Sequence, residues 1–239
     1  MPPAATPVAT AAAGLDLPRA ERVTLNGIAY DGLKRALLSG RLEPGAVVTL
    51  RQLADELGTS MMPVREAVSR LAAEGALAVQ PNRGIVVPAL DDGDAADIWA
   101  LRISLEGDAS ARAARHADAA TSAALRARCR AVEEAAAEGH LHRVLACNSE
   151  FQFAVYQAAQ SPVLLQLIET LRMRSVPHCT AAIRVLLAER PPYYARSWTN
   201  HAALVEAIAA GDAPAARRLK QADLREFRDF VNAVRKEQR

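Results

Sequence analysis

The sequence predicts a mainly α-helical protein, in which an N-terminal winged helix-turn-helix is followed by an all-α antiparallel helical bundle. Composition gives the first indication. Alanine is the commonest residue and glycine occurs only 12 times in 239 residues, and alanine favours helices. The spacing of apolar residues gives the second indication. Runs typical of strands occur only before residue 90, and apolar residues recur at helical spacing in the rest of the chain. Apolar residues make up 51% and charged residues 23%, as in globular domains.

Glycine and proline turns divide the first 90 residues. Residues 1–23, with several prolines and many small side chains, are expected to form a disordered tail. The elements predicted after this tail are a helix over 28–38, a strand-like run over 46–49, helices over 50–57 and 60–74, and strands over 76–80 and 85–87. Thr49 and Ser60 are predicted to cap the second and third helices, and Gly58 makes the tight turn between them. This order defines a winged helix-turn-helix, which we assign to residues 24–90.

Residues 95–237 are predicted to form the bundle. Buried stripes at helical spacing give helices over 95–116, 121–138, 142–159, 162–188, 195–210 and 213–237. Glycine and proline residues separate these helices. Pro177 lies inside the fourth helix, so a kink is expected there. The sequence has no run of about 18 apolar residues, and no membrane-spanning helix is therefore expected.

Polar and basic residues of the third helix and the wing are the candidate DNA contacts. A winged helix places its third helix in the major groove, with the first turn nearest to the bases. Arg65 is the strongest candidate, because a guanidinium group matches guanine or a phosphate in a bidentate way. The full candidate set is Arg51, Ser60, Met61, Arg65, Asn82, Arg83 and Gly84. The alternative is that these arginines are ordinary solvated charges. The net charge is only +2, so any DNA-binding surface must be a local patch.

Several polar residues interrupt the apolar stripes of the bundle helices. Arg102, for example, lies between Ile98 and Leu105 in a stripe that otherwise faces the core. The residues of this kind are Arg102, Asn148, Gln152, His178, His201 and Asp223. Their convergence predicts a cavity that binds a small anionic effector, because arginine binds carboxylates and phosphates in a bidentate way. The alternative is a set of core polar residues that satisfy one another, above all an Arg102–Asp223 ion pair.

The N-terminal part resembles the GntR family of bacterial transcription regulators. The resemblance is carried by residues 29–34, 39–45, 53–60, 63–67 and the wing at 81–84. In that family the positions of Arg51, Met61 and Arg65, together with the wing, contact DNA. Many members have arginine at the position of Met61, which implies that one base contact differs here.

The bundle is similar to the effector domain of the FadR subfamily, which is of the FCD type. The likeness lies in residues 101–106, 151–162 and 200–212. Many members hold a divalent metal with one aspartate and three histidines, at positions that here are Asn148, Gln152, His201 and Asp223. Amides bind zinc-like ions poorly, so we expect neither a tightly held metal nor a cofactor. His178 is the alternative ligand for a weak metal site.

Together these features predict a one-component bacterial transcription regulator, most simply a repressor. A homodimer is expected to bind a palindromic operator in double-stranded DNA and to respond to a small organic acid. Three widely spaced cysteines give no disulfide framework, which agrees with a cytoplasmic location. One alternative is a DNA-binding dimer without an effector, and another is a helical-bundle enzyme. The sequence has no phosphate loop, nucleophile elbow or HExxH motif, which disfavours an enzyme.

Overall fold

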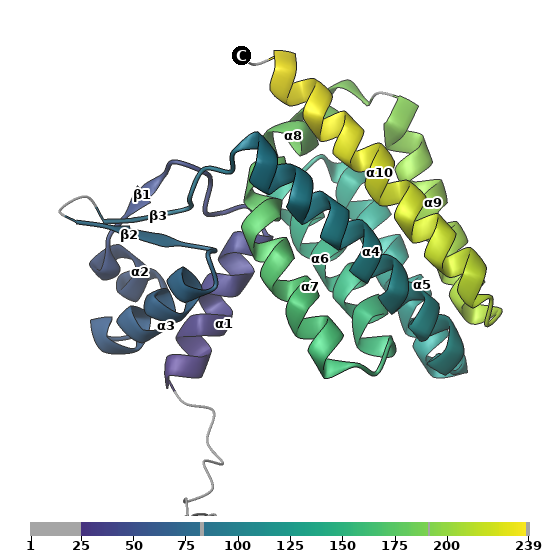
Figure 1. Ribbon diagram of the computed structural model, residues 1–239, viewed down its shortest axis with the longest axis horizontal. Helices are drawn as coiled ribbons and strands as arrows, with labels where there is room; N and C mark the ends of the chain where they lie inside the picture. Colours follow the sequence, from purple (N-terminus) through teal and green to yellow (C-terminus); the bar gives the residue numbers. More distant parts are fainter. Residues whose placement is uncertain (1–24, 82–83, 191, 238–239) are drawn as a thin grey trace, which may run out of the picture.

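Three helices and a small sheet make up the N-terminal part of the protein (Figure 1). The computed structural model describes residues 25–81, 84–190 and 192–237, and the predicted tail at 1–23 lies outside these ranges. The elements of this part are α1 (Leu25–Leu38), β1 (Val47–Val48), α2 (Leu50–Glu56), α3 (Met61–Ala73), β2 (Ala78–Gln80) and β3 (Gly84–Val86). The antiparallel sheet has the order β1-β3-β2, with Val48 opposite Ile85. This is the predicted winged helix-turn-helix.

Local signals explain where the second and third helices begin. Thr49 caps α2, because its hydroxyl accepts from the backbone N–H of Gln52 at 3.2 Å and the Gln52 side chain accepts from the Thr49 N–H. Ser60 also occupies an N-cap position, that of α3, but its side chain makes no capping hydrogen bond. Gly58 has a φ of +62°, a conformation that residues with a Cβ seldom adopt. Glycine therefore allows the tight turn between α2 and α3.

The remainder of the described chain is helical. Its elements are α4 (Asp92–His116), α5 (Ala119–Glu138), α6 (Leu141–Ala158), α7 (Pro162–Ser175), a 3₁₀ turn (Val176–Cys179), α8 (Thr180–Glu189), α9 (Pro192–Ala209) and α10 (Ala213–Glu237). α4 runs beside α10, and α5 packs against α6 and α9 (Figure 1). The described part of the chain thus forms the predicted all-α bundle. It contains no helix with the length and apolar character needed to cross a membrane.

The predicted single helix over 162–188 is wrong. α7 ends at Ser175, the 3₁₀ turn follows, and α8 begins at Thr180. Pro177 lies in this turn and has no N–H to donate to the preceding turn, while its ring crowds the carbonyl four residues earlier. The chain therefore breaks into two helices instead of only kinking. α9 also begins earlier than predicted, at Pro192, because proline is tolerated in the first turn of a helix.

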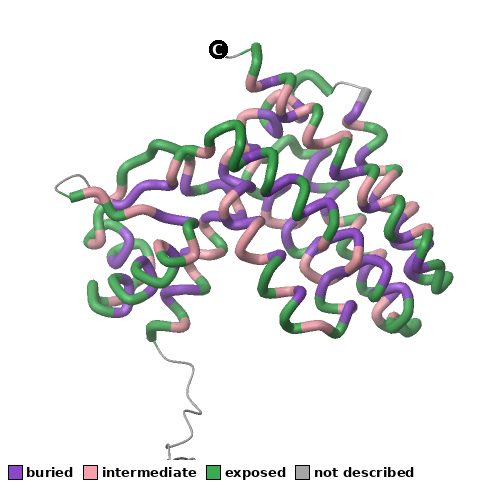
Figure 2. The backbone as a smooth tube through the Cα atoms, viewed as in Figure 1, coloured by how far each residue is buried: buried purple, intermediate pink, exposed green. Residues whose placement is uncertain are grey.

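The last turn of α1 is embedded in the bundle. Leu38 is buried in a hydrophobic cluster that continues into the bundle through Leu145, and Figure 2 shows buried positions on both sides of this junction. Gly40 follows with a φ of +66°, and a Cβ there would lie 2.6 Å from Thr180 Cγ2. The winged helix-turn-helix and the bundle therefore share one core at this point.

Candidate functional site

The candidate DNA contacts gather at the starts of α3 and α2. Ser60, Met61 and Arg65 are exposed at the beginning of α3, whose opposite face is buried through Val64 and its neighbours. Arg51 is exposed in the first turn of α2. Within the described ranges, neither Arg51 nor Arg65 has an ion-pair or hydrogen-bond partner. Both guanidinium groups are therefore free of internal partners there.

The wing is described only in part. Asn82 and Arg83 lie outside the described residues. Gly84 opens β3 with a φ of +110°, and a Cβ at this position would lie 2.7 Å from the carbonyl oxygen of Val48. The close pairing of β3 with β1 thus requires glycine at this position, independently of any contact with DNA.

A cavity of about 70 Å³ lies between the helices of the bundle. Five of the six predicted ligand residues line it, namely Arg102, Asn148, Gln152, His201 and Asp223. They come from α4, α6, α9 and α10, so their side chains converge from four helices. The walls also include the aromatic side chains of Tyr193, Trp198 and Phe227, and Leu38 from the last turn of α1.

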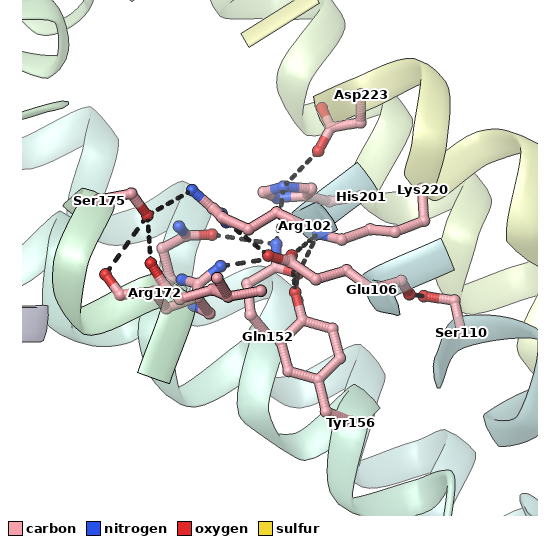
Figure 3. A network of polar contacts seen from close by, with 12 residues as sticks. Arg102, Glu106, Ser110, Gln152, Tyr156, Arg172, Ser175, His201, Lys220 and Asp223 are labelled. Atoms are coloured by element: carbon pink, nitrogen blue, oxygen red, sulfur yellow. Dashed lines mark hydrogen bonds and ion pairs between the residues drawn. The ribbon is translucent and has the colours of Figure 1, made fainter. Parts of the chain in front are cut away.

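Glu106 on α4, which the sequence analysis overlooked as a site residue, lies at the centre of a buried polar cluster (Figure 3). Its Oε1 is 2.7 Å from Arg102 Nε. Its Oε2 is 3.5 Å from both Arg172 Nη1 and Lys220 Nζ, and it accepts a hydrogen bond from the Tyr156 hydroxyl. The four charged residues are at most 4% exposed. One carboxylate thus contacts three basic side chains, and the carboxylate of Asp223, further along the cavity, also attracts Lys220.

The pKa values of the side chains in this cluster are set by burial and by the neighbouring charges. Burial by itself raises the pKa of Glu106, but the three cations, Arg102 foremost, outweigh burial and hold the pKa at about 2. Burial disfavours the charged form of Arg102, yet Glu106 raises its pKa overall. Burial is also the largest influence on Lys220 and lowers the pKa of its ammonium group, in spite of Glu106. Glu106 and Arg102 are therefore ionised at neutral pH.

A second set of polar contacts leads from the cluster to Asp223. Gln152 Oε1 accepts from Lys220 Nζ and lies 3.1 Å from the Tyr156 hydroxyl oxygen. Gln152 Nε2 lies 3.3 Å from His201 Nε2, which in turn lies 3.7 Å from Asp223 Oδ2. Figure 3 shows His201 between Asp223 and the Glu106 cluster. One connected chain of polar side chains therefore spans the cavity.

Three buried nitrogen atoms of residues around the cavity have no hydrogen-bond partner among the described residues. They are Arg172 Nε, Trp198 Nε1 and His201 Nδ1. An unpaired buried polar group costs about 1–3 kcal/mol, and such groups are uncommon in folded proteins. All three belong to residues that line the same cavity.

Two of the ligand residues have partners outside the expected set. Glu106, one turn further along α4, is the ion-pair partner of Arg102, so the alternative of an Arg102–Asp223 pair is not what the structure has. His178 is absent from the lining of the cavity and hydrogen-bonds the backbone of Pro88 instead. The reason is the helix break, because a 3₁₀ turn has three residues per turn and rotates His178 off the face that a continuous helix would have given it.

The partners of Arg102 in this cluster differ in how far the sequence alone could have predicted them. Arg102 and Glu106 are four residues apart, and opposite charges at this spacing pair on a helix surface. Lys220 is one of only three lysines in the chain and lies on the face of α10 that points into the bundle. Arg172 and Tyr156 gave no such signal, because they reach Glu106 only through the packing of α6 and α7 against α4.

The residues at the expected metal positions do not fit a metal ion. Asn148 and Gln152 offer amide oxygens, and Gln152 Oε1 already accepts a hydrogen bond from the ammonium group of Lys220. His201 and Asp223 alone are too few for a structural or catalytic transition-metal site. In the described ranges, no group of three or more histidine, cysteine or acidic side chains could hold a metal. We therefore derive no step through a metal.

An exposed helix-turn-helix surface joined to a bundle with a polar cavity defines a DNA-binding regulator with a ligand-binding domain. Comparison with known families supports this class. Residues 26–87 match the bacterial regulatory proteins of the gntR family, and residues 97–236 match the FCD domain. The chain therefore belongs to the GntR family, in the group that carries an FCD domain.

Individual relatives are also transcription regulators. The HTH-type transcriptional regulator McbR of Escherichia coli (strain K12) is 32% identical over 157 residues, which are 66% of this chain and 71% of that protein. The solved structure of E. coli McbR/YncC has a TM-score of 0.80 at 27% identity, and covers 91% of this chain and 100% of that one. The gluconate operon transcriptional repressor of Bacillus subtilis (strain 168) is 34% identical over 79 residues, 33% of this chain and 32% of that protein. This protein is thus a transcription regulator and not an enzyme.

Proposed function

We propose that the protein is a homodimeric repressor, which binds a palindromic operator and releases it when a small organic acid enters the bundle cavity. The three buried cations around Glu106 carry this proposal, because a buried surplus of positive charge requires an anionic partner. The adjoining cavity and the unpartnered nitrogen atoms support a ligand that also forms hydrogen bonds. These features favour an effector domain over a bundle that only dimerises.

The ligand residues divide into two groups. Arg102, Arg172 and Lys220 are proposed to hold the carboxylate of the acid, since all three line the cavity and, among the described residues, contact the same carboxylate, that of Glu106. The remaining polar atoms of the acid are proposed to meet Asn148, Gln152, His201 and Asp223. A guanidinium–carboxylate contact supplies both charge and direction. An acid in this position would therefore be held in one orientation.

The DNA contacts are proposed on the residues that the sequence singled out. Arg65 and Met61 lie where a recognition helix reaches the base edges, and Arg51 lies at a helix start, which suits a phosphate. The complete proposed set is Arg51, Ser60, Met61, Arg65, Asn82, Arg83 and Gly84. Since an operator lies in the bacterial cytoplasm, we place the protein there.

α1 provides the connection between the cavity and the DNA-reading surface. Leu38 lines the cavity, and α1 packs along α3. Lys34 of α1 also forms an ion pair with Glu169 of α7 at 3.3 Å. A ligand that displaces the cavity wall would therefore displace α1, and α3 with it. The operator would be released once the two recognition helices no longer have the spacing that matches the two half-sites.

Arg65→Ala tests the DNA-binding proposal. Binding sites are first selected from a random DNA pool with the full-length protein, and affinities are then measured by fluorescence anisotropy at one salt concentration. Loss of a bidentate base contact costs about 1–3 kcal/mol in each half-site, so Arg65→Ala should bind the selected site at least about tenfold more weakly. Arg115→Ala, the same change on an exposed arginine of the bundle, is the control. Wild-type affinity in Arg65→Ala would contradict the assignment of the recognition helix.

A further inference from the structure

We infer that the ligand of the bundle cavity is a small α-amino acid, with its carboxylate at the Glu106 cluster and its ammonium group at Asp223. This inference rests on the proposed function, because it takes the cavity as the effector site. It goes further in that it names a zwitterion instead of any organic acid. The evidence lies in the opposite charges of the two ends of the cavity.

One end of the cavity is short of negative charge. Glu106 is the single carboxylate that contacts Arg102, Arg172 and Lys220. Arg172 is the least satisfied of the three, since its ion pair with Glu106 is 3.5 Å long and its Nε has no partner among the described residues. A ligand carboxylate beside Arg172 and Lys220 would add a second counter-charge next to that of Glu106.

The other end is short of positive charge. Asp223 is buried, and its contacts are long, with 3.4 Å to both the Tyr193 hydroxyl and Asn200 Nδ2 and 3.7 Å to His201 Nε2. Charge-assisted hydrogen bonds to a carboxylate measure about 2.7–2.9 Å. A carboxylate can accept several such bonds. Asp223 therefore lacks a close donor within the described part of the chain.

His201 lies beside Asp223 without a short contact to it. The amide orientation of Gln152 is fixed, because its Oε1 accepts from the Lys220 ammonium group, which can only donate, and this directs its NH₂ group towards His201 Nε2. The NH₂ group only donates, so His201 Nε2 is placed to accept from it, and its distance of 3.7 Å from Asp223 Oδ2 is longer than a hydrogen bond. His201 Nδ1 has no partner in the described ranges. A ligand ammonium group could therefore give Asp223 a closer donor than the protein does.

The surroundings of Asp223 suit an ammonium group. Tyr193, Trp198 and Phe227 line the same cavity, and the rings of Tyr193 and Phe227 stack 6.2 Å apart. Aromatic faces attract cations, and the carboxylate adds a full negative charge. A dicarboxylate is disfavoured here, because its second carboxylate would meet Asp223 as a like charge.

Spacing and volume set the size of the ligand. Lys220 and Asp223 are one turn apart on the same face of α10, about 4.5 Å along the helix axis, so groups that bind them belong to neighbouring atoms of a ligand. An α-amino acid carries its two charged groups on one carbon atom. The cavity of about 70 Å³ is about half of the ~150 Å³ that accommodates benzene. Glycine, alanine and serine are therefore the candidates.

Calorimetric titration of the full-length protein tests the inference with a matched series of ligands. L-Alanine is compared with propionate, which lacks the ammonium group, with L-lactate, which has a hydroxyl in its place, and with ethylamine, which lacks the carboxylate. L-Alanine should bind at least about tenfold more tightly than each of the others, the effect of one ionic contact of about 1.4 kcal/mol or more. This comparison of ligands uses the wild-type protein alone, so it tests the class of ligand without any variant. Equal or tighter binding of propionate or lactate would overturn the amino acid assignment and leave the acid site intact.

Asp223→Asn assigns the ammonium position. It should weaken L-alanine at least about tenfold and leave propionate within about twofold, because only the amino acid loses an ionic contact. Asp229→Asn, the same change at an exposed position of α10, is the control. An equal loss for both ligands would overturn the placement of the ammonium group. If neither alanine, propionate nor lactate binds the wild type, the inference and the proposed acid site both fail.

Discussion

At Glu106 a single carboxylate lies among three side chains that carry positive charge. Its oxygen atoms are within 3.5 Å of Arg102, Arg172 and Lys220, and the side chain is 0% exposed. In the absence of this carboxylate three buried cations would remain together without a counter-charge, which is more costly than the loss of an exposed ion pair. Protonation of Glu106 in acid removes the same attraction. The stability of the bundle should therefore depend on this one residue.

Glu106→Gln is predicted to destabilise the fold by about 3–5 kcal/mol at pH 7. The pKa of Glu106 is about 2, against an ordinary value of 4.5. The interaction is thus fully present above about pH 4.5 and is lost as the pH falls towards 2. Urea unfolding of wild type and variant from pH 2.5 to 7 measures both effects. The difference in stability should shrink in acid.

Glu134→Gln is the matched control, because Glu134 is exposed on α5. It should change the stability by at most about 0.5 kcal/mol. A Glu106→Gln protein as stable as the control at pH 7 would show that the three cations do not depend on Glu106.

The same cluster shows which site residues a sequence can reveal. Asn148 and Gln152 were predictable, because a polar residue in an apolar helical stripe has to face something inside the bundle. The partner of Arg102 was predictable from the spacing of four residues to Glu106, because opposite charges at this spacing lie on the same face of a helix. Arg172 was not predictable, because its approach depends on how α7 is tilted against α4, and periodicity describes each helix separately.

At the scale of elements, the turn residues determined which helix boundaries could be predicted from the sequence. The winged helix-turn-helix was predictable because Gly58 and the capping residue Thr49 fix the ends of short helices by local geometry. The break within the predicted helix over 162–188 was not predictable. Pro177 allows either a kinked helix or two separate helices, and the outcome depends on tertiary packing. The break has a consequence for the site, because it carries Cys179 and Val176 into the cavity wall and leaves His178 outside.

Leu38→Ala is predicted to uncouple ligand and operator. Leu38 is the contribution of α1 to the cavity wall, and truncation opens space that a ligand fills without displacing α1. The operator affinity is measured with and without saturating L-alanine, or the acid of the same series that binds. In the wild type a coupling of about 5–150-fold is typical, whereas in Leu38→Ala the two affinities should agree within about twofold.

Leu42→Ala is the control for this variant. Leu42 is buried in the same hydrophobic cluster, but it does not line the cavity. Both variants should lose about 2–5 kcal/mol of stability, so stability is measured alongside. Wild-type coupling in Leu38→Ala would show that the signal does not pass through α1.

At the scale of the molecule, one hydrophobic cluster joins the DNA-reading part to the bundle. It runs from Leu33 of α1 and Leu71 on the buried face of the recognition helix to Met173 and Leu224 in the bundle. A continuous packed core transmits displacements, because its parts cannot move independently without opening voids. The recognition helix and the cavity therefore belong to one mechanical unit within the chain.

The full-length protein is predicted to be a dimer that needs both halves of its operator. The first turns of one α3 helix present few side chains that can contact bases, chiefly Met61 and Arg65. One winged helix-turn-helix alone would therefore give limited sequence specificity. Two heads related by a two-fold axis require half-sites in inverted orientation, with centres separated by about 34–36 Å or a multiple of it. Sedimentation equilibrium should give a mass of twice 25.6 kDa. Scrambling one half-site of the selected operator should weaken binding at least about a hundredfold, the loss of two or more base contacts at 1–3 kcal/mol each, while inverting the whole site should change nothing. A monomer that binds one half-site as tightly as the full operator would contradict the two-fold arrangement.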